Sequence, residues 1–223
     1  MGKDKAVLIV AVTIVVTLIG GGLLLNFQRN QEAVDEEDEA IVETGEADPA
    51  ADVIVTLEEF GDYQSQSCAD LNPTLKKLKE EYGANLNMVF RNLPLSINKN
   101  ALLAAQAAEA ARMQSRFWEM HDLLYAKQKE WKDEENPLPK FVQWAGDLGI
   151  DVTRFRQDID SDPVKLRLEA DKDAAIARGI QELPAIVING RRLKTDAMTP
   201  DGIREGIEVM LTRGSEEAPA QSP

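Results

Sequence analysis

Residues 60–73 read FGDYQSQSCADLNP, and they contain Cys68, the only cysteine of the chain. The stretch follows a short run of β-branched residues, passes through a turn and leads into a helical pattern. Two cysteines spaced C-x-x-C at such a turn would indicate a redox site. The chain instead has S-x-x-C, with Ser65 at the first position. The meaning of that serine is the central question about function.

The residues around this turn predict a βαβ unit. Residues 53–60 (VIVTLEEF) and 86–91 (LNMVFR) have the length and composition of strands. Between them a helix is predicted to end at Gly83, and Pro73 lies inside it, where a kink is expected. Two strands joined by one helix are expected to be parallel, with a right-handed crossover. The helix has an apolar stripe made of Cys68, Leu71, Leu75, Leu78 and Tyr82.

The next part of the chain, about residues 97–179, is predicted to be an all-helical insertion. Alanines form a small-residue face at its start, and aromatic residues and leucines continue the apolar pattern. Asp162 and Pro163 are expected to be the N-cap and the first residue of a helix that runs to Gly179. These apolar faces indicate a packed helical subdomain.

The C-terminal part is predicted to return to strands. Residues 185–188 (AIVI) and 191–194 flank Asn189 and Gly190, which both tolerate the positive φ of a type I′ turn. A last helix is expected to begin at Thr199 and Pro200, and residues 213–223 are expected to form a disordered tail. The predicted fold class is therefore α/β, with the order βαβ, helical insertion, ββα over residues 52–212.

The N-terminus contains an uncharged apolar run at residues 6–25. A helix of about 20 apolar residues crosses the hydrocarbon of a bilayer, so we expect a transmembrane anchor here. Lys3 and Lys5 favour a cytoplasmic location for residues 1–5, which puts the folded domain outside the cytoplasm, either periplasmic or extracellular. A cleaved signal peptide is the alternative, although the run is long for one and no A-x-A site closes it.

Residues 26–51 are expected to be an acidic linker between the anchor and the domain. Within residues 30–50 there are nine acidic side chains and no basic ones. Such a run repels itself and buries little surface, so it behaves as an extended tether.

Composition excludes several classes of protein. A formal net charge of -14 argues against nucleic-acid binding, which requires a basic surface. One cysteine excludes an internal disulfide and any multi-cysteine zinc site. We find no ligand set for a metal and expect no cofactor.

Six segments, in order, resemble the DsbA-like thiol-disulfide oxidoreductases, a family that includes membrane-anchored extracytoplasmic members. The resemblance covers about residues 52–212 and implies a thioredoxin fold interrupted by a helical domain. The matching pieces are EFGDYQ before the turn, Pro73 in the first helix, FRNLPL at the second strand, FWEMHDLLYAKQ in the insertion, LGID after it, and LPAIVING at the hairpin.

The resemblance implies roles for Ser65 and Cys68. In the family the first cysteine of C-x-x-C lies at a helix N-terminus, where the helix dipole stabilises its thiolate, and the second cysteine resolves the mixed disulfide. These positions match Ser65 and Cys68. A serine hydroxyl is not appreciably ionised near neutral pH. Dithiol chemistry is therefore lost or disabled, through a natural replacement or an engineered exchange of sulfur for oxygen.

The resemblance also implies a substrate-binding role for Leu183 and Pro184. Family members carry a cis-proline opposite the active-site turn, and the backbone of its neighbour pairs with an extended polypeptide. The family residue before this proline is commonly Thr or Val, so Leu183 is a departure that affects substrate handling. A trans-proline that begins a strand is the alternative.

Each candidate residue also has an ordinary structural interpretation. Ser65 suits the N-cap of a helix, and Cys68 lies on an apolar stripe where a buried thiol acts as a small hydrophobe. His121, the only histidine, is interpreted as a packing residue beside Trp118 and Tyr125.

Three functions remain open at this point. The first is a thiol-disulfide oxidoreductase without its attacking cysteine, in which Cys68 forms mixed disulfides but does not resolve them. The second is a non-catalytic peptide-binding or chaperone-like module that keeps the groove beside Pro184 for extended or unfolded polypeptides. The third is a dimer cross-linked through Cys68. The sequence identifies no redox partner.

Overall fold

The computed structural model describes residues 54–217. The predicted cytoplasmic segment 1–5, the anchor 6–25, the whole acidic linker 26–51 and the end of the tail lie outside these residues, as does the start of the domain at residues 52 and 53. No helix within residues 54–217 combines the length and the apolar character that a membrane crossing requires.

The centre of the fold is a four-stranded sheet in the order β2-β1-β3-β4. β1 (Val55–Gly61) and β2 (Leu86–Asn92) are parallel and are joined by α2 (Gln66–Tyr82) and a 3-10 turn (Gly83–Asn85). β3 (Ala185–Ile188) runs antiparallel to β1, and the short β4 (Arg191–Arg192) runs antiparallel to β3. The predicted βαβ unit and the predicted hairpin are therefore both present.

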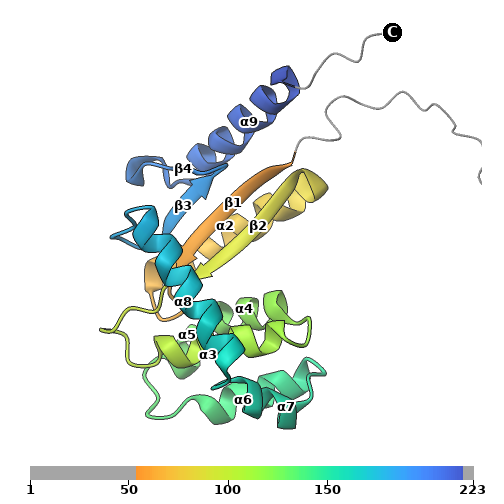
Figure 1. Ribbon diagram of the computed structural model, residues 1–223, viewed down its shortest axis with the longest axis vertical. Coiled ribbons are helices and arrows are strands. Elements are labelled where there is room, and N and C mark those ends of the chain that lie inside the picture. The colour runs from red at the N-terminus through yellow and green to blue at the C-terminus, as the bar shows by residue number, and fades with distance from the viewer. Residues whose placement is uncertain (1–53, 218–223) are drawn as a thin grey trace, which may run out of the picture. The chain divides into compact units, whose positions relative to one another are not determined.

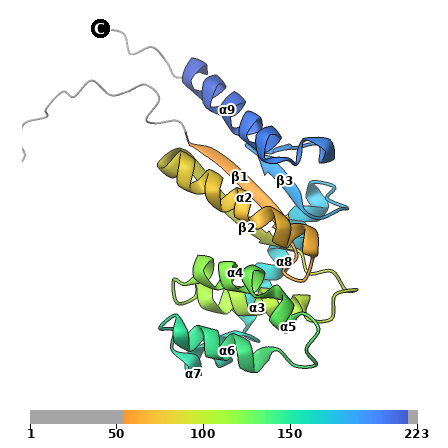
Figure 2. The same cartoon turned by 180° about the vertical axis from the view of Figure 1, so that it is seen from behind.

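Helices cover both faces of this sheet. On one face, α2 and α9 (Pro200–Glu217) bury an apolar layer in which Leu75 and Ile207 meet Leu57 of β1. On the other face, Ala175 of α8 (Asp162–Ala177) packs near Phe60 and Val187. Figures 1 and 2 show α8 on one side of the sheet and α2 on the opposite side.

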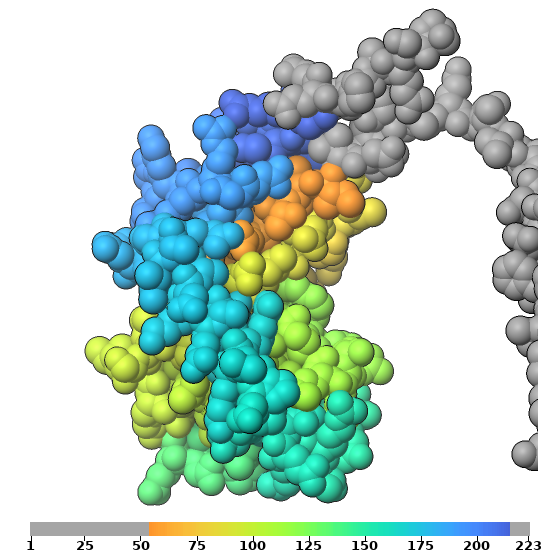
Figure 3. Space-filling view, in the orientation of Figure 1, coloured from red at the N-terminus to blue at the C-terminus, as the bar shows by residue number. Residues whose placement is uncertain are grey.

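A helical subdomain is inserted between β2 and β3, as predicted. Its main core is continuous with the end of the sheet, because Phe90 of β2 packs with Phe117, Trp131 and Phe141. In the space-filling view, α8 extends from this subdomain toward the sheet (Figure 3). Besides α8, the helices are α3 (Ala101–Arg112), α4 (Phe117–Ala126), α5 (Gln128–Trp131), α6 (Leu138–Asp147) and α7 (Val152–Asp158).

A buried polar network attaches α8 to the sheet and to α3. Asp171 is fully buried, and it accepts hydrogen bonds from the backbone N–H of Asn92 at 3.0 Å and from Arg91 at 3.2 Å. The side-chain amide of Asn92 also donates to Glu109 of α3 at 2.7 Å. Buried charges are tolerated in proteins when they are paired in this way.

Several boundaries differ from the sequence-based expectations. β1 ends at Gly61 and β2 at Asn92, one residue later than predicted, and α8 ends at Ala177 rather than at Gly179. The N-cap of α8 is Ser161, whose backbone is extended, so Asp162 is the first helical residue and its charge favours the helix N-terminus. The second strand of the hairpin ends at Arg192 rather than at residue 194. The last helix continues to Glu217, five residues into the predicted tail, because Leu211 still packs against the core beyond Ile207.

Candidate functional site

Ser65 is the N-cap of α2, as the sequence predicted. Its backbone is extended (φ -73°, ψ 128°), and its hydroxyl oxygen accepts a hydrogen bond from the N–H of Cys68 at 3.4 Å. The turn before it is closed by a hydrogen bond from the Ser65 N–H to the carbonyl of Asp62 at 3.0 Å. A hydroxyl group therefore lies where the unpaired N–H groups of the helix converge.

The turn at Ser65 lies beside the segment that leads into β3. The hydroxyl oxygens of Ser65 and Ser67 are 2.9 Å apart, and the Ser67 hydroxyl donates to the carbonyl of Leu183 at 3.4 Å. The peptide bond between Leu183 and Pro184 is cis. Segments more than a hundred residues apart in sequence thus form one surface that includes Ser65 and Leu183.

Cys68 faces the opposite way, into the core. Its side chain is 0% exposed and lies in the apolar cluster that also contains Tyr63 and Phe90. Burial raises the pKa of the Cys68 thiol to about 11, and hydrogen bonds from Asp62 and Ser65 offset this only partly. The thiol is therefore un-ionised at neutral pH. The inward orientation is the one that the apolar stripe predicted.

Two further polar groups lie in the same interior region. Glu59 of β1 is buried, and this burial raises the pKa of its carboxyl group to about 8. Glu59 Oε1 and the hydroxyl of Tyr125 have no hydrogen-bond partner among the described residues. Sequence reasoning missed Glu59, although one signal was present: a strand buried on both faces cannot keep both Glu58 and Glu59 in solvent.

Gln128 fixes the backbone of the turn from the helical subdomain. Its buried side-chain amide donates to the carbonyls of Tyr63 and Ser65, both at 2.9 Å. These bonds connect α5 to the turn across more than sixty residues of sequence. Sequence analysis included Gln128 only as the last letter of a matching segment, because its partners are backbone atoms that no side-chain pattern indicates.

Asp62 holds the loop that follows β2 against the same turn. One carboxylate oxygen accepts from the backbone N–H of Gln64 at 2.7 Å. The other accepts from the N–H of Leu95 at 3.0 Å and from the side-chain amide of Asn98 at 2.7 Å. The loop of residues 93–98 is thereby kept next to Ser65.

A cavity of about 600 Å³ opens between this loop, α8 and the segment before Pro184. Its apolar lining is accessible to solvent: Ile97 is 86% exposed and Ile176 of α8 is 67% exposed. Ser65 and Leu183 lie at the same cavity. The site thus combines exposed apolar side chains with a short stretch of accessible backbone, an arrangement suited to an extended polypeptide.

His121 is a buried packing residue, as expected. Its Nδ1 lies 3.0 Å from the hydroxyl of Tyr63, and its Nε2 lies 3.0 Å from Oδ1 of Asn72. Burial lowers the pKa of His121 to about 3, so the ring is neutral at physiological pH. Within residues 54–217, no group of three or more His, Cys, Asp or Glu side chains is arranged to hold a metal ion.

Comparison with known proteins identifies a family for most of the chain. A family model described as Thioredoxin matches residues 45–209. A probable disulfide bond formation protein D from Bacillus anthracis is 32% identical over 178 residues, which cover 73% of this chain and 76% of that protein. The crystal structure of oxidised BdbD from Bacillus subtilis is similar at 27% identity, with a TM-score of 0.64, over 73% of this chain and 90% of that one.

A second group of relatives consists of longer proteins. The Na(+)/H(+) antiporter NhaA 1 of Salinispora arenicola is 35% identical over 139 residues, which make up 62% of this chain and 20% of the antiporter. The chain therefore spans about a fifth of the length of the first relatives that it matches.

Proposed function

Because the chain belongs to the DsbA-like thiol-disulfide oxidoreductases of the thioredoxin family, we propose that it is a member that binds polypeptides and has lost dithiol chemistry. Ser65 stands at the position where the family resemblance expects the attacking cysteine, by natural replacement or by engineered exchange. Disulfide exchange needs a thiolate at this position and a second thiol to resolve the mixed disulfide. In this chain the hydroxyl group of Ser65 replaces the attacking thiolate.

The observation that carries this proposal is the burial of Cys68. A thiol that is 0% exposed, with a pKa of about 11, is neither accessible to a substrate disulfide nor ionised to attack one. This argues against mixed-disulfide formation through Cys68. It argues equally against a dimer cross-linked through the same sulfur, because the two sulfur atoms would have to meet.

The cavity beside Ser65 supports the second part of the proposal, that the protein binds polypeptides. The cavity of about 600 Å³ beside Ser65 has exposed apolar side chains that a polypeptide would cover. The backbone at Leu183 lies at its edge and is available for pairing with an extended chain in the manner of an added strand. We infer that an extended or unfolded polypeptide is the ligand, and that Pro184 shapes the backbone that it meets.

We also propose that the domain is held outside the cytoplasm by residues 6–25 as a single-pass anchor. The support is the uncharged apolar run with Lys3 and Lys5 before it and the acidic segment after it. Resistance of the chain to alkaline carbonate extraction, and its loss when residues 6–25 are deleted, would test the anchor.

Binding is tested by titrating the full chain, in detergent, with a fluorescently labelled peptide that is unfolded and contains no cysteine. We expect saturable binding that Ile176→Asp weakens about tenfold or more, because a charge replaces apolar contact area in the cavity. Leu166→Asp is the matched control, since Leu166 is also on α8 and 64% exposed but does not line the cavity. Equal affinity in both variants would contradict the proposed groove.

Loss of chemistry is tested by restoring the first thiol. In Ser65→Cys, the introduced thiol and Cys68 together supply two electrons and two protons to a substrate disulfide, which becomes two thiols while the protein forms a disulfide. We expect exchange with a one-disulfide model peptide for this variant and none for the parent chain. Ser67→Cys also adds a second thiol, but not at the helix N-cap, and should remain inactive. Activity in the parent chain would contradict the proposal.

A further inference from the structure

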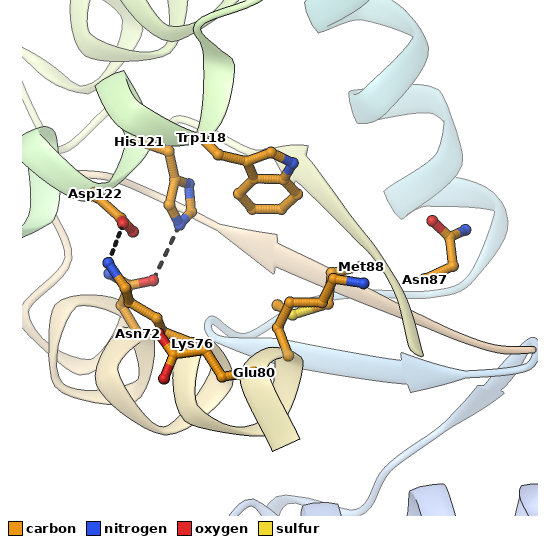
Figure 4. A pocket seen from close by; sticks show the side chains of 9 residues that line it. Asn72, Lys76, Glu80, Asn87, Met88, Trp118, His121 and Asp122 are labelled. Atoms are coloured by element: carbon orange, nitrogen blue, oxygen red, sulfur yellow. Dashed lines mark hydrogen bonds and ion pairs between the residues drawn. The ribbon is translucent and has the colours of Figure 1, made fainter. Parts of the chain in front are cut away.

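A second cavity, of about 390 Å³, lies on the flank of α2 between α2, β2 and α4 (Figure 4). It shares no lining residue with the cavity beside Ser65. A ligand in it would contact neither Ser65 nor Leu183. The function proposed above gives this second cavity no role.

One wall of this cavity is apolar and flat. Trp118 is 41% exposed, whereas Trp131 and Trp144 are buried in the helical subdomain. The indole of Trp118 projects from α4 beside His121 and toward Met88 of β2 (Figure 4). His121 holds it edge-on at 5.1 Å between ring centroids. An indole that is fixed in place and open to solvent offers a stacking surface for a planar ring.

The hydrogen bonds of His121 determine which way the amide of Asn72 points. The Oδ1 atom of Asn72 has no hydrogen to give, so Nε2 of His121 is the donor in the 3.0 Å contact between them. Nδ1 of His121 consequently accepts from the hydroxyl of Tyr63. Since the Asn72 oxygen faces the histidine, its NH₂ group is left free of that bond. This NH₂ group makes no hydrogen bond to any residue within 54–217.

A cation lies on the same face of α2, one turn further along. The ammonium group of Lys76 donates to Asp122 of α4 and lines the cavity together with Asn72. An ammonium group has three N–H bonds, so two remain for a ligand. The neighbouring Lys79 is directed to the backbone carbonyls of Gly83 and Leu86. The donors nearest to His121 and Asp122 on this face of α2 therefore include the side-chain amide of Asn72 and the partly paired ammonium group of Lys76.

We propose that this cavity binds a small planar aromatic carboxylate, with its ring against Trp118 and its carboxylate on Asn72 and Lys76. The volume admits one ring or two fused rings. The charges of Lys76 and Lys79 are balanced by those of Asp122 and Glu80 in the lining. The carboxylate would therefore be held by direct hydrogen bonds rather than by a net positive charge of the cavity. Carboxylates form their strongest hydrogen bonds with charged and amide donors of this kind.

The test uses phenylacetate, and its neutral isostere phenylacetamide, with the full chain in detergent. Calorimetric titration gives the affinities, and the NMR signals of the Asn72 side-chain NH₂ and the Trp118 indole N–H report the location. We expect saturable binding of phenylacetate that shifts both signals, with phenylacetamide about tenfold weaker because a charge-assisted hydrogen bond is lost. Equal affinities for the two compounds would overturn the proposal.

Two variants separate the ligand contacts from the fold. Asn72→Asp keeps an oxygen that accepts from His121 but replaces the free NH₂ by an anion, so it should weaken phenylacetate binding by tenfold or more. Trp118→Ala should abolish binding, and Trp118→Phe should restore part of it. Gln143→Ala, at an exposed position of α6, should bind as the parent does. Undiminished binding by Asn72→Asp, or no saturable binding by the parent chain, would also overturn the proposal.

Discussion

The two faces of the first turn of α2 have opposite properties, although only three residues separate them. The outward face carries the hydroxyl of Ser65 and borders the cavity of about 600 Å³. The inward face carries the thiol of Cys68, near the unpaired carboxyl oxygen of Glu59 and hydroxyl of Tyr125. The outward face is accessible to solvent, and the inward face is closed to it. A single turn thus presents a hydroxyl group at the surface and keeps its thiol within the core packing.

The largest contrast between the faces should appear in thiol reactivity. We expect native Cys68 to react with a thiol reagent at pH 8 at least about 100-fold more slowly than an ordinary thiol, since a pKa near 11 leaves little thiolate. The matched protein is Ser65→Cys combined with Cys68→Ser, which presents one thiol on the outward face and should react rapidly. Rapid labelling of native Cys68 would show that the inward face is as accessible to the reagent as the outward face, which would contradict this comparison.

The buried carboxyl group of Glu59, on the inward side, should make stability depend on pH. The pKa of Glu59 rises from 4.5 to about 8 on folding, so the folded protein keeps a proton that the unfolded chain releases between these values. This stabilisation is complete below pH 4.5 and is lost as the pH rises through 8. A tenfold change in proton affinity between the folded and unfolded states corresponds to about 1.4 kcal/mol. We expect Glu59→Gln to be more stable than the parent by several kcal/mol at pH 8.5.

The measurement is chemical denaturation of both proteins at pH 4.5 and pH 8.5. At the lower pH the two free energies of unfolding should agree within about 0.4 kcal/mol, because the parent carboxyl group is protonated in the folded state and half protonated in the unfolded chain. Glu130→Gln, which changes an exposed carboxylate, should show no such divergence. A constant difference between Glu59→Gln and the parent at the two pH values would mean that the Glu59 pKa is not raised.

Gln128 holds the backbone of the turn that joins the two faces. Replacing it by alanine leaves the carbonyls of Tyr63 and Ser65 without their donor, and each unsatisfied buried group costs about 1–3 kcal/mol. We expect Gln128→Ala to lose about 2–3 kcal/mol in the free energy of unfolding and to exchange amide hydrogens faster at residues 63–68. Gln143→Ala should change stability by less than about 0.5 kcal/mol. Unchanged exchange at the turn would show that Gln128 does not hold it.

The outward face itself should contribute least to stability. Ser65→Ala removes an N-cap, which typically costs about 1 kcal/mol, and the 3.4 Å contact with the Cys68 N–H puts this case at the lower end, about 0.5 kcal/mol. Ser67→Ala is the matched control and should cost less. Thermal melts of the two variants decide the order. A larger loss of stability in Ser67→Ala than in Ser65→Ala would show that Ser67, and not Ser65, caps the helix.

The elements with a regular pattern could be predicted from sequence, and their tertiary partners could not. The stripe from Cys68 to Leu78 predicted the buried face of α2, and Asn189 with Gly190 predicted the hairpin, where both residues adopt positive φ. Such signals are local, because a helix or a two-residue turn repeats its own geometry. The start of α8 was wrong by one residue, since Ser161 and Asp162 are both good caps.

The candidate site was predictable only where a family motif covered it. Ser65, Cys68 and Pro184 followed from the resemblance, but the residues that hold the turn did not. Asp62 accepts from the backbone N–H of Leu95, 33 residues away, and Gln128 donates to backbone carbonyls more than sixty residues away. One sequence carries no record of such pairs. The cavity beside Ser65 was likewise not predicted in detail, because three separate segments must meet to form it.

The position of β1 has a mechanical consequence. β1 begins at Val55, is the first strand of the described chain, and is hydrogen-bonded on both sides, to β2 in parallel and to β3 antiparallel. A pull transmitted through the preceding residues therefore loads both ladders in shear, and many hydrogen bonds must break together. Tension applied at the N-terminus should consequently leave the turn at Ser65 and the cavity beside it in their folded arrangement.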